Sequence, residues 1–313
     1  MTMPTQAQLL RQVRLALQNQ DYAGAVDGLR QAAALARDSD DRSTEARHLG
    51  NLALLYYRLG EPDQALTCFD EALEAARADS DRMTENGLLG NMGNILRELE
   101  RFREAAGYLN QALLIAQETG DLRGRGIWLG NLGLVNDDLK QYARAVELHH
   151  QSVEIARELN DKRGLATRLG NLGNSYISLN DFHSALQQFH EATALYRELG
   201  DWGALSTRLG VVGRLYADLG RQAIDLKQRE SYLDLSLEHY QQALMFARYM
   251  NDRRSEAELL RNIGTIYAEV TNYEQAIAHL NEAMQRYAEA NMPDLAQETR
   301  QQLETVQGRR KAD

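Results

Sequence analysis

The sequence has little of what disulfide-bonded, zinc-binding and membrane proteins are built from. Cys68 is the only cysteine in 313 residues, so an internal disulfide and a cysteine-based zinc site are both excluded, and the chain suits a reducing compartment. No apolar run approaches the roughly 18 residues that a membrane span requires, and residues 1–10 contain no basic stretch leading into an apolar core. We therefore expect a cytoplasmic protein with no membrane partner.

Proline and aromatic residues are scarce as well, and basic residues are outnumbered by acidic ones, 35 to 45. The chain has three prolines and 7% aromatic residues, whereas 43% of its residues are hydrophobic. Ala, Leu, Glu, Gln and Arg are abundant, and these residues lose the least rotamer freedom in a helix, so the composition predicts an all-α protein. The net charge of -10 opposes binding to nucleic acid or to an anionic membrane, because both carry the same sign.

A Leu-Gly-Asn motif recurs at a constant interval (90 − 50 = 40). Its four copies are Leu49-Gly50-Asn51, Leu89-Gly90-Asn91, Leu129-Gly130-Asn131 and Leu169-Gly170-Asn171, and Leu209-Gly210-Val211 is an altered fifth copy. A sixth copy is centred on Asn262 and follows Val211 at a longer interval (262 − 211 = 51), so the segment 221–231 is an insertion. This insertion either lengthens two helices into a finger or forms a surface loop.

Each repeat contains residues that are typical of helix ends, in an order that predicts a helix, a turn and a second helix. An aspartate suited to capping a helix begins the copies, and residues that tolerate the left-handed conformation end several of them. A second break falls at Gly60, Asn180 and Gly220. We expect a single domain over 1–313 with seven hairpins and a capping helix, at about 6–36, 42–77, 82–117, 122–158, 162–199, 202–249, 253–290 and 294–307.

The repeats resemble those of the tetratricopeptide family. The fourth copy shows the family pattern in its first helix with Leu169, Leu172, Gly173 and Tyr176, and its second helix continues it with Ala185, Phe189 and Ala192. The resemblance implies a right-handed superhelical solenoid. The 40-residue form is most similar to the Pins-type Leu-Gly-Asn adaptors of spindle orientation, and it is also similar to bacterial regulatory proteins that carry caspase-like or nucleotide-binding domains. The usual proline at the end of the second helix is missing here.

Two sets of glycines interrupt the helices, although each costs about 1 kcal/mol relative to alanine. The resemblance places one set where the two helices of a hairpin touch: Gly93, Gly133, Gly173, Gly213 and Gly264. The other set lies three residues earlier, on what the family uses as its inner, concave surface: Gly50, Gly90, Gly130, Gly170 and Gly210. We expect this second set to leave room for a bound chain close to the helix backbone.

In most copies an asparagine directly follows the glycine of this second set, at a place where the resemblance implies an inward-pointing amide. The set consists of Asn51, Asn91, Asn131, Asn171 and Asn262, with Asn94 and Asn174 one helical turn further on. A carboxamide both donates and accepts, so a row of them would hold the backbone of an extended peptide. The alternative is that these residues are inherited from the family or cap local backbone.

Arginines near the row favour a peptide with acidic positions, because guanidinium groups bind carboxylates through two hydrogen bonds. The candidates are Arg168, Arg208, Arg214 and Arg261. The alternative is an ordinary mixture of solvated charges. Either Trp128 or Trp202 also suits an anchor for a partner, although Trp128 is expected to pack between adjacent repeats.

No pattern in the sequence indicates catalysis or a cofactor. The histidines His149, His150, His183 and His190 lack a carboxylate or cysteine set that would complete a metal site. The glycines lie within helices, whereas a phosphate loop follows a strand. We therefore expect a non-enzymatic adaptor that binds a protein or peptide without a cofactor, and its oligomeric state is left open. The alternative is a regulatory module that senses a ligand and controls an effector domain in cis or trans.

Overall fold

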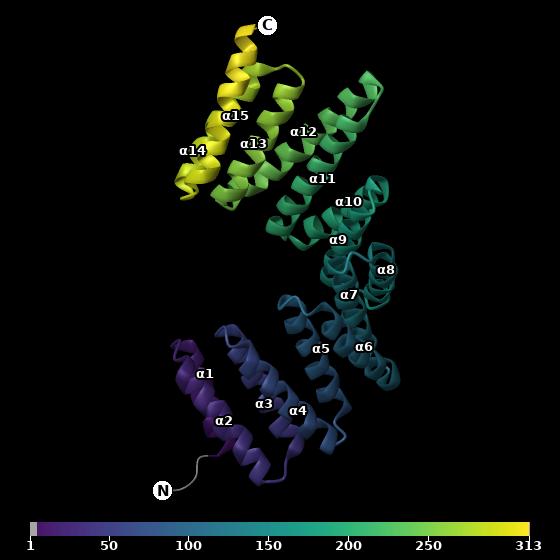
Figure 1. The fold of residues 1–313 in the computed structure, drawn as a ribbon, viewed down its shortest axis with the longest axis vertical. Coiled ribbons are helices and arrows are strands. Elements are labelled where there is room, and N and C mark those ends of the chain that lie inside the picture. Colours follow the sequence, from purple (N-terminus) through teal and green to yellow (C-terminus); the bar gives the residue numbers. More distant parts are fainter. Residues whose placement is uncertain (1–4, 313) are drawn as a thin grey trace. The chain divides into compact units, whose positions relative to one another are not determined.

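The computed structural model describes residues 5–312, and these residues form fifteen α-helices without a strand (Figure 1). The helices are α1 (Gln6–Gln18), α2 (Tyr22–Asp38), α3 (Arg42–Arg58), α4 (Pro62–Ala78), α5 (Arg82–Glu98), α6 (Phe102–Thr119), α7 (Leu122–Asp138), α8 (Tyr142–Glu158), α9 (Lys162–Ser178), α10 (Phe182–Leu199), α11 (Trp202–Gln222), α12 (Leu226–Tyr249), α13 (Arg253–Glu269), α14 (Tyr273–Glu289) and α15 (Pro293–Ala312). The predicted all-α fold of seven hairpins and a closing helix is confirmed.

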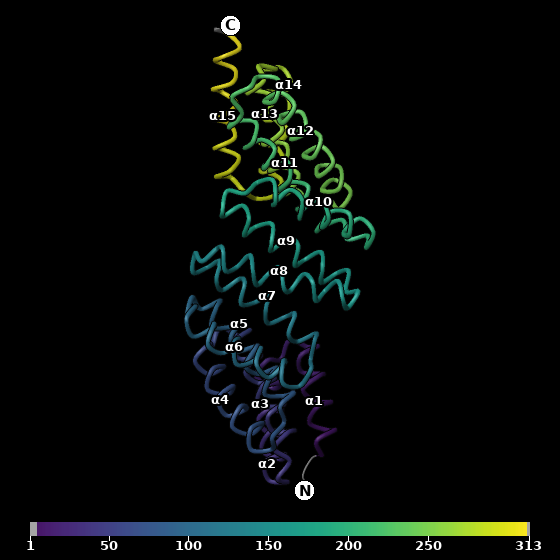
Figure 2. Tube along the Cα trace, turned by 90° about the vertical axis from the view of Figure 1, so that its right-hand side faces the viewer, coloured from purple at the N-terminus to yellow at the C-terminus, as the bar shows by residue number. Residues whose placement is uncertain are grey.

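The chain divides into two compact units, unit 1 (Met1–Ile155) and unit 2 (Ala156–Asp313), with the boundary inside α8. Within each unit, neighbouring helices along the chain pack against each other, as the traces in Figure 2 show. The first helices of successive hairpins also touch, α3 with α5 and α5 with α7 in unit 1, and α11 with α13 in unit 2. The expected single domain over 1–313 stays a prediction.

The predicted helix starts and ends are confirmed in detail. Each expected aspartate accepts a hydrogen bond from a backbone N–H in the first turn of the helix that it precedes; these caps are Asp41, Asp81, Asp121, Asp161, Asp201 and Asp252. Gly120 (φ 71°), Gly200 (φ 66°), Asn160 (φ 52°) and Asn251 (φ 57°) adopt the left-handed conformation at helix ends. Local chemistry therefore gives most of the helices nearly the same length.

The predicted break at Gly220 is wrong, because α11 continues through this residue to Gln222. The turn comes at residues 223–225 instead, so the insertion lengthens α11 to 21 and α12 to 24 residues. Gly220 is buried, and a Cβ added there would lie 3.0 Å from the side chain of Leu233. The glycine serves the contact between the two long helices, whereas the chain reverses further on.

The two helices of a hairpin meet at the first glycine set, as expected. A Cβ on Gly173 would lie 2.5 Å from the ring of Phe189, and one on Gly264 would lie 2.8 Å from Leu280. His149 takes the same place against Gly133, so this histidine is a core residue. At the end of the chain, Leu303 and Val306 of α15 are buried against α14 and close the last hairpin.

Buried carboxylates hold three of the junctions between hairpins. Glu85 on α5 accepts hydrogen bonds from Arg77 at 2.7 Å and from Arg82 at 2.7 Å. Burial opposes its ionisation, but these hydrogen bonds outweigh burial and lower the pKa of Glu85. Glu45 and Glu256 are held by arginines in the same way.

Candidate protein-binding face

The five asparagines of the Leu-Gly-Asn row, Asn51, Asn91, Asn131, Asn171 and Asn262, lie on the first helix of their hairpins, on the side away from the second helix. Asn91 precedes the interhelical contact residue Gly93 by two positions, which places the two side-chain directions roughly 160° apart around α5. The same spacing relates every asparagine of the Leu-Gly-Asn row to its contact residue. We call this surface of each unit its asparagine face: that of unit 1 carries Asn51, Asn91, Asn94 and Asn131 on α3, α5 and α7, and that of unit 2 carries Asn171, Asn174 and Asn262 on α9 and α13.

The side-chain amides of these seven asparagines have no hydrogen-bond partner among residues 5–312. Other asparagines behave differently: Asn110, Asn136 and Asn281 donate to the carbonyl oxygen four residues earlier, at 2.8, 2.7 and 2.9 Å. All seven side chains of the face are exposed or partly exposed. Their donors and acceptors are therefore free of local capping and accessible from outside.

The glycines of the Leu-Gly-Asn motif do not leave room for a ligand, which corrects the expectation from sequence. A side chain from the next first helix fills the space over each of three glycines. A Cβ on Gly50 would lie 2.5 Å from Leu88, and one on Gly90 would lie 2.1 Å from Trp128. A Cβ on Gly170 would lie 2.5 Å from Arg208.

The two remaining glycines of this set fit the same explanation in part. Gly210 faces Leu259 of α13, at an ordinary contact distance of 3.4 Å from an added Cβ, and Gly130 faces Ser152 at 3.1 Å. Packing between neighbouring helices therefore accounts for Gly50, Gly90, Gly130 and Gly170, where an added side chain would crowd its neighbour, whereas an alanine would fit at Gly210.

Trp128 shows how closely a neighbouring side chain fits its glycine. The indole is 8% exposed, lies against Gly90 and donates from Nε1 to Oδ1 of Asn86 at 2.6 Å. The expected packing of Trp128 between repeats is confirmed. Trp202 is partly buried and stacks on Phe246 with ring centroids 5.3 Å apart.

The four candidate arginines are in different environments. Arg168 lies 3.6 Å from the Asp161 carboxylate, and Arg261 lies 3.6 Å from Glu298. Arg214 is exposed on α11, at the position that Asn94 and Asn174 hold in their helices. Arg208 is partly buried, with its guanidinium 4.8 Å from the centre of the Phe189 ring. Sequence spacing did not separate these four situations.

The asparagine face of unit 2 is hollowed between α11 and α13. The cavity of about 220 Å³ is lined by Thr207, Val211 and Arg214 from α11 and by Glu258 and Asn262 from α13, among others. It therefore brings one predicted asparagine and one predicted arginine together with a carboxylate. A small side chain of a partner, or one turn of its backbone, has space there.

Comparison with known families agrees with these helical hairpins. The sequence profile of the tetratricopeptide repeat matches residues 5–78, 84–158 and 126–198, more than half of the chain. The chain belongs to the tetratricopeptide repeat family. A comparison with curated protein sequences gives no match. The Pins-like subtype stays a prediction.

Several solved structures are similar in fold to this tetratricopeptide repeat protein. One is the signal transduction ATPase with numerous domains, which has a tetratricopeptide repeat sensor, from Pyrococcus horikoshii (TM-score 0.69, 16% identity); the match covers 96% of this chain but only 49% of that protein. Aspartyl phosphate phosphatase F from Bacillus subtilis matches with a TM-score of 0.62 at 14% identity, over 88% of this chain and 74% of that one. BtubC from P. vanneervenii matches with 0.54 at 17%, over 90% and 92%.

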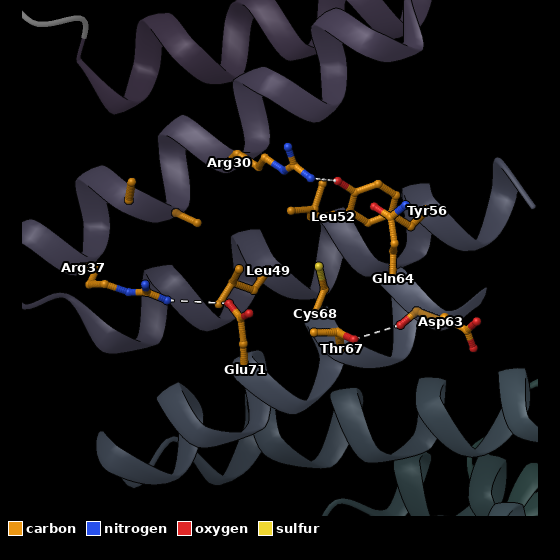
Figure 3. A pocket seen from close by; sticks show the side chains of 12 residues that line it. Arg30, Arg37, Leu49, Leu52, Tyr56, Asp63, Gln64, Thr67, Cys68 and Glu71 are labelled. Atoms are coloured by element: carbon orange, nitrogen blue, oxygen red, sulfur yellow. Dashed lines mark hydrogen bonds and ion pairs between the residues drawn. The ribbon is translucent and has the colours of Figure 1, made fainter. Parts of the chain in front are cut away.

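A second cavity lies in unit 1, on the opposite side of α3 from Asn51. Sequence reasoning missed this cavity. This cavity of about 420 Å³ lies between α2, α3 and α4 (Figure 3). The Arg30 guanidinium is hydrogen-bonded to the Tyr56 hydroxyl at its edge, and the sulfur of Cys68 points into it. Burial raises the pKa of the Cys68 thiol, which opposes its reactivity as a thiolate.

A histidine and tyrosine cluster packs α10, α11 and α12 together in unit 2. His190 is hydrogen-bonded to the Tyr216 hydroxyl at 3.2 Å, and His239 stacks on the Tyr216 ring at 5.4 Å. Burial lowers the pKa of both imidazoles. Among the described residues, no three histidine, cysteine or acidic side chains are grouped to hold a metal, and no helix is long and apolar enough to span a membrane.

Proposed function

We propose that this tetratricopeptide repeat protein is a non-enzymatic cytoplasmic adaptor that binds an extended or partly helical peptide of a partner protein on its asparagine face. One observation carries the proposal: seven accessible carboxamides lie on the first helices, the five of the Leu-Gly-Asn row point away from the second helices, and none of the seven has a hydrogen-bond partner within the described chain. Each could pair with an N–H and a C=O of the same peptide residue, which grips backbone with little regard for sequence.

Selectivity for acidic positions would come from arginines beside these amides. Arg214 supports this part of the proposal, because it is exposed on the face and shares the hollow between α11 and α13 with Asn262. Arg168 and Arg261 already have carboxylates within 4 Å, so a peptide would have to compete with Asp161 and Glu298 for them. We therefore assign Arg168 and Arg261 a smaller share of the binding energy than Arg214.

The test starts with affinity capture from the native host and mapping of the bound segment to a synthetic peptide. Replacing Asn91, Asn131 and Asn171 together with Ala should then weaken binding of this peptide about fivefold for each amide pair that is lost, since each pair contributes roughly 1 kcal/mol. Circular dichroism should be unchanged and the thermal midpoint unchanged or higher, because these side chains have no partner to lose and alanine has the higher helix propensity.

The matched control replaces Asn110 and Asn281, which bond to their own helices, and it should leave affinity unchanged. Wild-type affinity in the triple variant would refute the proposed role of the asparagine face, whatever the partner is.

A second candidate function is a ligand-sensing module that controls an effector domain, caspase-like or nucleotide-binding, in cis or trans. The resemblance in fold to the tetratricopeptide repeat sensor of the Pyrococcus ATPase supports it. A catalytic domain fused to this chain or encoded beside it, whose activity changes when the Asn91, Asn131 and Asn171 variant replaces the wild type, would favour this candidate. An effector that responds equally to both would count against it.

A further inference from the structure

The cavity of unit 1 between α2, α3 and α4 is open at a position where other hairpins carry a larger side chain. Cys68 occupies this position and directly precedes Phe69, just as His279 directly precedes Leu280, which packs against Gly264. The five later hairpins have these residues there: Tyr108, Leu148, Gln188, His239 and His279. Cys68 leaves more space than any of these five side chains.

In unit 2, two rings at this position contact a tyrosine of the first helix in their hairpin. His239 stacks on Tyr216 with ring centroids 5.4 Å apart, and His279 lies 5.3 Å from the Tyr267 ring. The tyrosine at the same place in α3 is Tyr56. In this hairpin α4 contributes a thiol where α12 and α14 contribute a ring, so the cavity marks the place of a missing aromatic group.

The cavity has the size and the lining of a site for a small aromatic molecule. Its volume of about 420 Å³ lies within the range of small-ligand pockets. Leu49, Leu52 and Tyr56 of α3 are buried and form its floor, and Ala33 of α2 forms part of a wall. The sulfur of Cys68 points into the cavity (Figure 3), and polarisable sulfur makes favourable contacts with aromatic rings. An aromatic ring therefore suits this space.

The charges at the rim favour an anionic group on such a ligand. Arg37 is already balanced, because the Glu71 carboxylate lies 3.7 Å from it. Arg30 is exposed and hydrogen-bonded to the Tyr56 hydroxyl, and it has no carboxylate within 4 Å among residues 5–312. The side chain of Asp63, the remaining carboxylate of the lining, points away from the thiol in Figure 3. The Arg30 guanidinium thus keeps donors for an anion from outside.

We infer that this cavity is a binding site for a small planar aromatic anion, such as an aromatic carboxylate. The ring of the ligand takes the place that His239 and His279 fill in their own hairpins, above Leu52 and beside the thiol of Cys68. Its anionic group pairs with Arg30 at the edge. The cavity lies on the opposite side of α3 from Asn51, so this inference goes beyond the proposed peptide binding and does not rest on it.

The thiol in the cavity provides a direct readout. Cys68 is the only cysteine of the chain, so its rate of alkylation by iodoacetamide reports whether the cavity is occupied. The probe is 2-naphthoate, a planar aromatic carboxylate, added to the full-length protein. We expect a Kd of about 1 mM for a ligand of this size, so about 10 mM probe should slow alkylation about tenfold.

Two matched compounds separate the ring from the charge. Decahydro-2-naphthoate keeps the carboxylate but is not planar, and 2-naphthamide keeps the planar ring but is neutral. Each should protect the thiol about threefold less than 2-naphthoate, because each lacks one of the two contacts.

Variants of the lining are compared by ligand-observed NMR, which measures Kd without a thiol. Cys68→His supplies the ring that α12 and α14 carry, so it should weaken binding of 2-naphthoate about tenfold or more, with an unchanged or higher thermal midpoint. Cys68→Ser keeps the cavity open and should leave Kd within about twofold. Arg30→Gln should remove the preference for 2-naphthoate over 2-naphthamide, whereas Arg103→Gln, which removes an exposed arginine of α6, should keep it.

Several results would overturn the inference. Unchanged alkylation of Cys68 in the presence of 2-naphthoate would do so, and so would equal protection by decahydro-2-naphthoate. A preference for the carboxylate that survives in Arg30→Gln would exclude Arg30 as its partner. Wild-type affinity in a folded Cys68→His protein would place the probe elsewhere.

Failure of the proposed peptide binding is a separate outcome. In the Asn91, Asn131 and Asn171 triple variant, 2-naphthoate should protect Cys68 as it does in the wild type, whether or not a partner peptide still binds. Loss of this protection in the triple variant would place the probe on the asparagine face and would overturn the inference.

Discussion

Substituting Gly90 by Ala tests whether neighbouring repeats need this glycine for packing. The added Cβ would lie 2.1 Å from Trp128, a distance that real atoms do not tolerate, and the indole is 8% exposed and cannot move into free space. Such overpacking costs about 1–3 kcal/mol, and losing the hydrogen bond from Trp128 to Asn86 adds about 1 kcal/mol. Alanine returns about 1 kcal/mol of helix propensity. We expect a net loss of about 1–3 kcal/mol.

The same helix provides the matched control. Gly87 is also inside α5, but a Cβ added there meets nothing within 4 Å. Gly87→Ala should therefore stabilise the protein by up to about 1 kcal/mol, through helix propensity alone. Urea unfolding followed by circular dichroism measures both variants, and equal m-values would show that the two midpoints can be compared.

Two results would refute the reasoning. If Gly90→Ala is as stable as Gly87→Ala, then Trp128 does not depend on the missing side chain. If Gly90→Ala keeps its stability but loses affinity for a partner peptide, the glycine leaves room for a ligand after all. A double variant with Trp128→Leu adds a third check, because the two changes should be non-additive by about 1 kcal/mol or more when they share one contact.

Two further predictions concern charge. Glu256 is 1% exposed and is held by Arg248, Arg253 and Arg286, so Glu256→Gln should lower the free energy of unfolding by about 1–2 kcal/mol; Glu258→Gln, which has one partner in an exposed arginine, should stay within about 0.5 kcal/mol in the same urea titration. The lowered pKa of His190 and His239 means that the unfolded chain binds more protons, so stability should fall as pH drops from about 7 to about 5. The midpoint of urea unfolding measures this slope, and a double variant of both histidines to Gln that keeps the full slope would contradict the assignment.

The helices could be predicted from sequence because their ends are fixed by local chemistry. Asp81 caps α5 through its own side chain, and Gly120 ends α6 through its backbone conformation, so neither depends on distant residues. The break predicted at Gly220 was wrong because the role of this residue depends on a distant contact. The same residue type serves turns and close helix contacts, and the choice at Gly220 depends on Leu233, which only the fold brings near.

The candidate site could be predicted in part. The resemblance to the tetratricopeptide family implied the position of Asn91 and Asn171, and in the structure both lie two residues before the contact glycine of their helix, on the side away from the second helix. The role of the adjacent glycines could not be predicted, because the side chains that fill the space over them come from the next repeat, as Leu88 does for Gly50. The partners of the arginines also depend on the packed fold. Sequence spacing gave Arg168 and Arg208 equivalent positions, although Asp161 is close to Arg168 and no carboxylate of the described chain is close to Arg208.

The Leu-Gly-Asn motif thus combines two tasks that share a helix and use different sides of it. Its glycine faces a neighbouring helix and must stay small where Leu88, Trp128 or Arg208 fills the space over it. Its asparagine faces away from the second helix and has no partner within the described chain, so packing leaves that position free to vary. Val211 illustrates the freedom: the glycine persists at Gly210 although the asparagine does not. Stability does not demand the other asparagines, so their repetition leaves two explanations, inheritance from the family and the peptide binding proposed above, and the affinity of the Asn91, Asn131 and Asn171 variant decides between them.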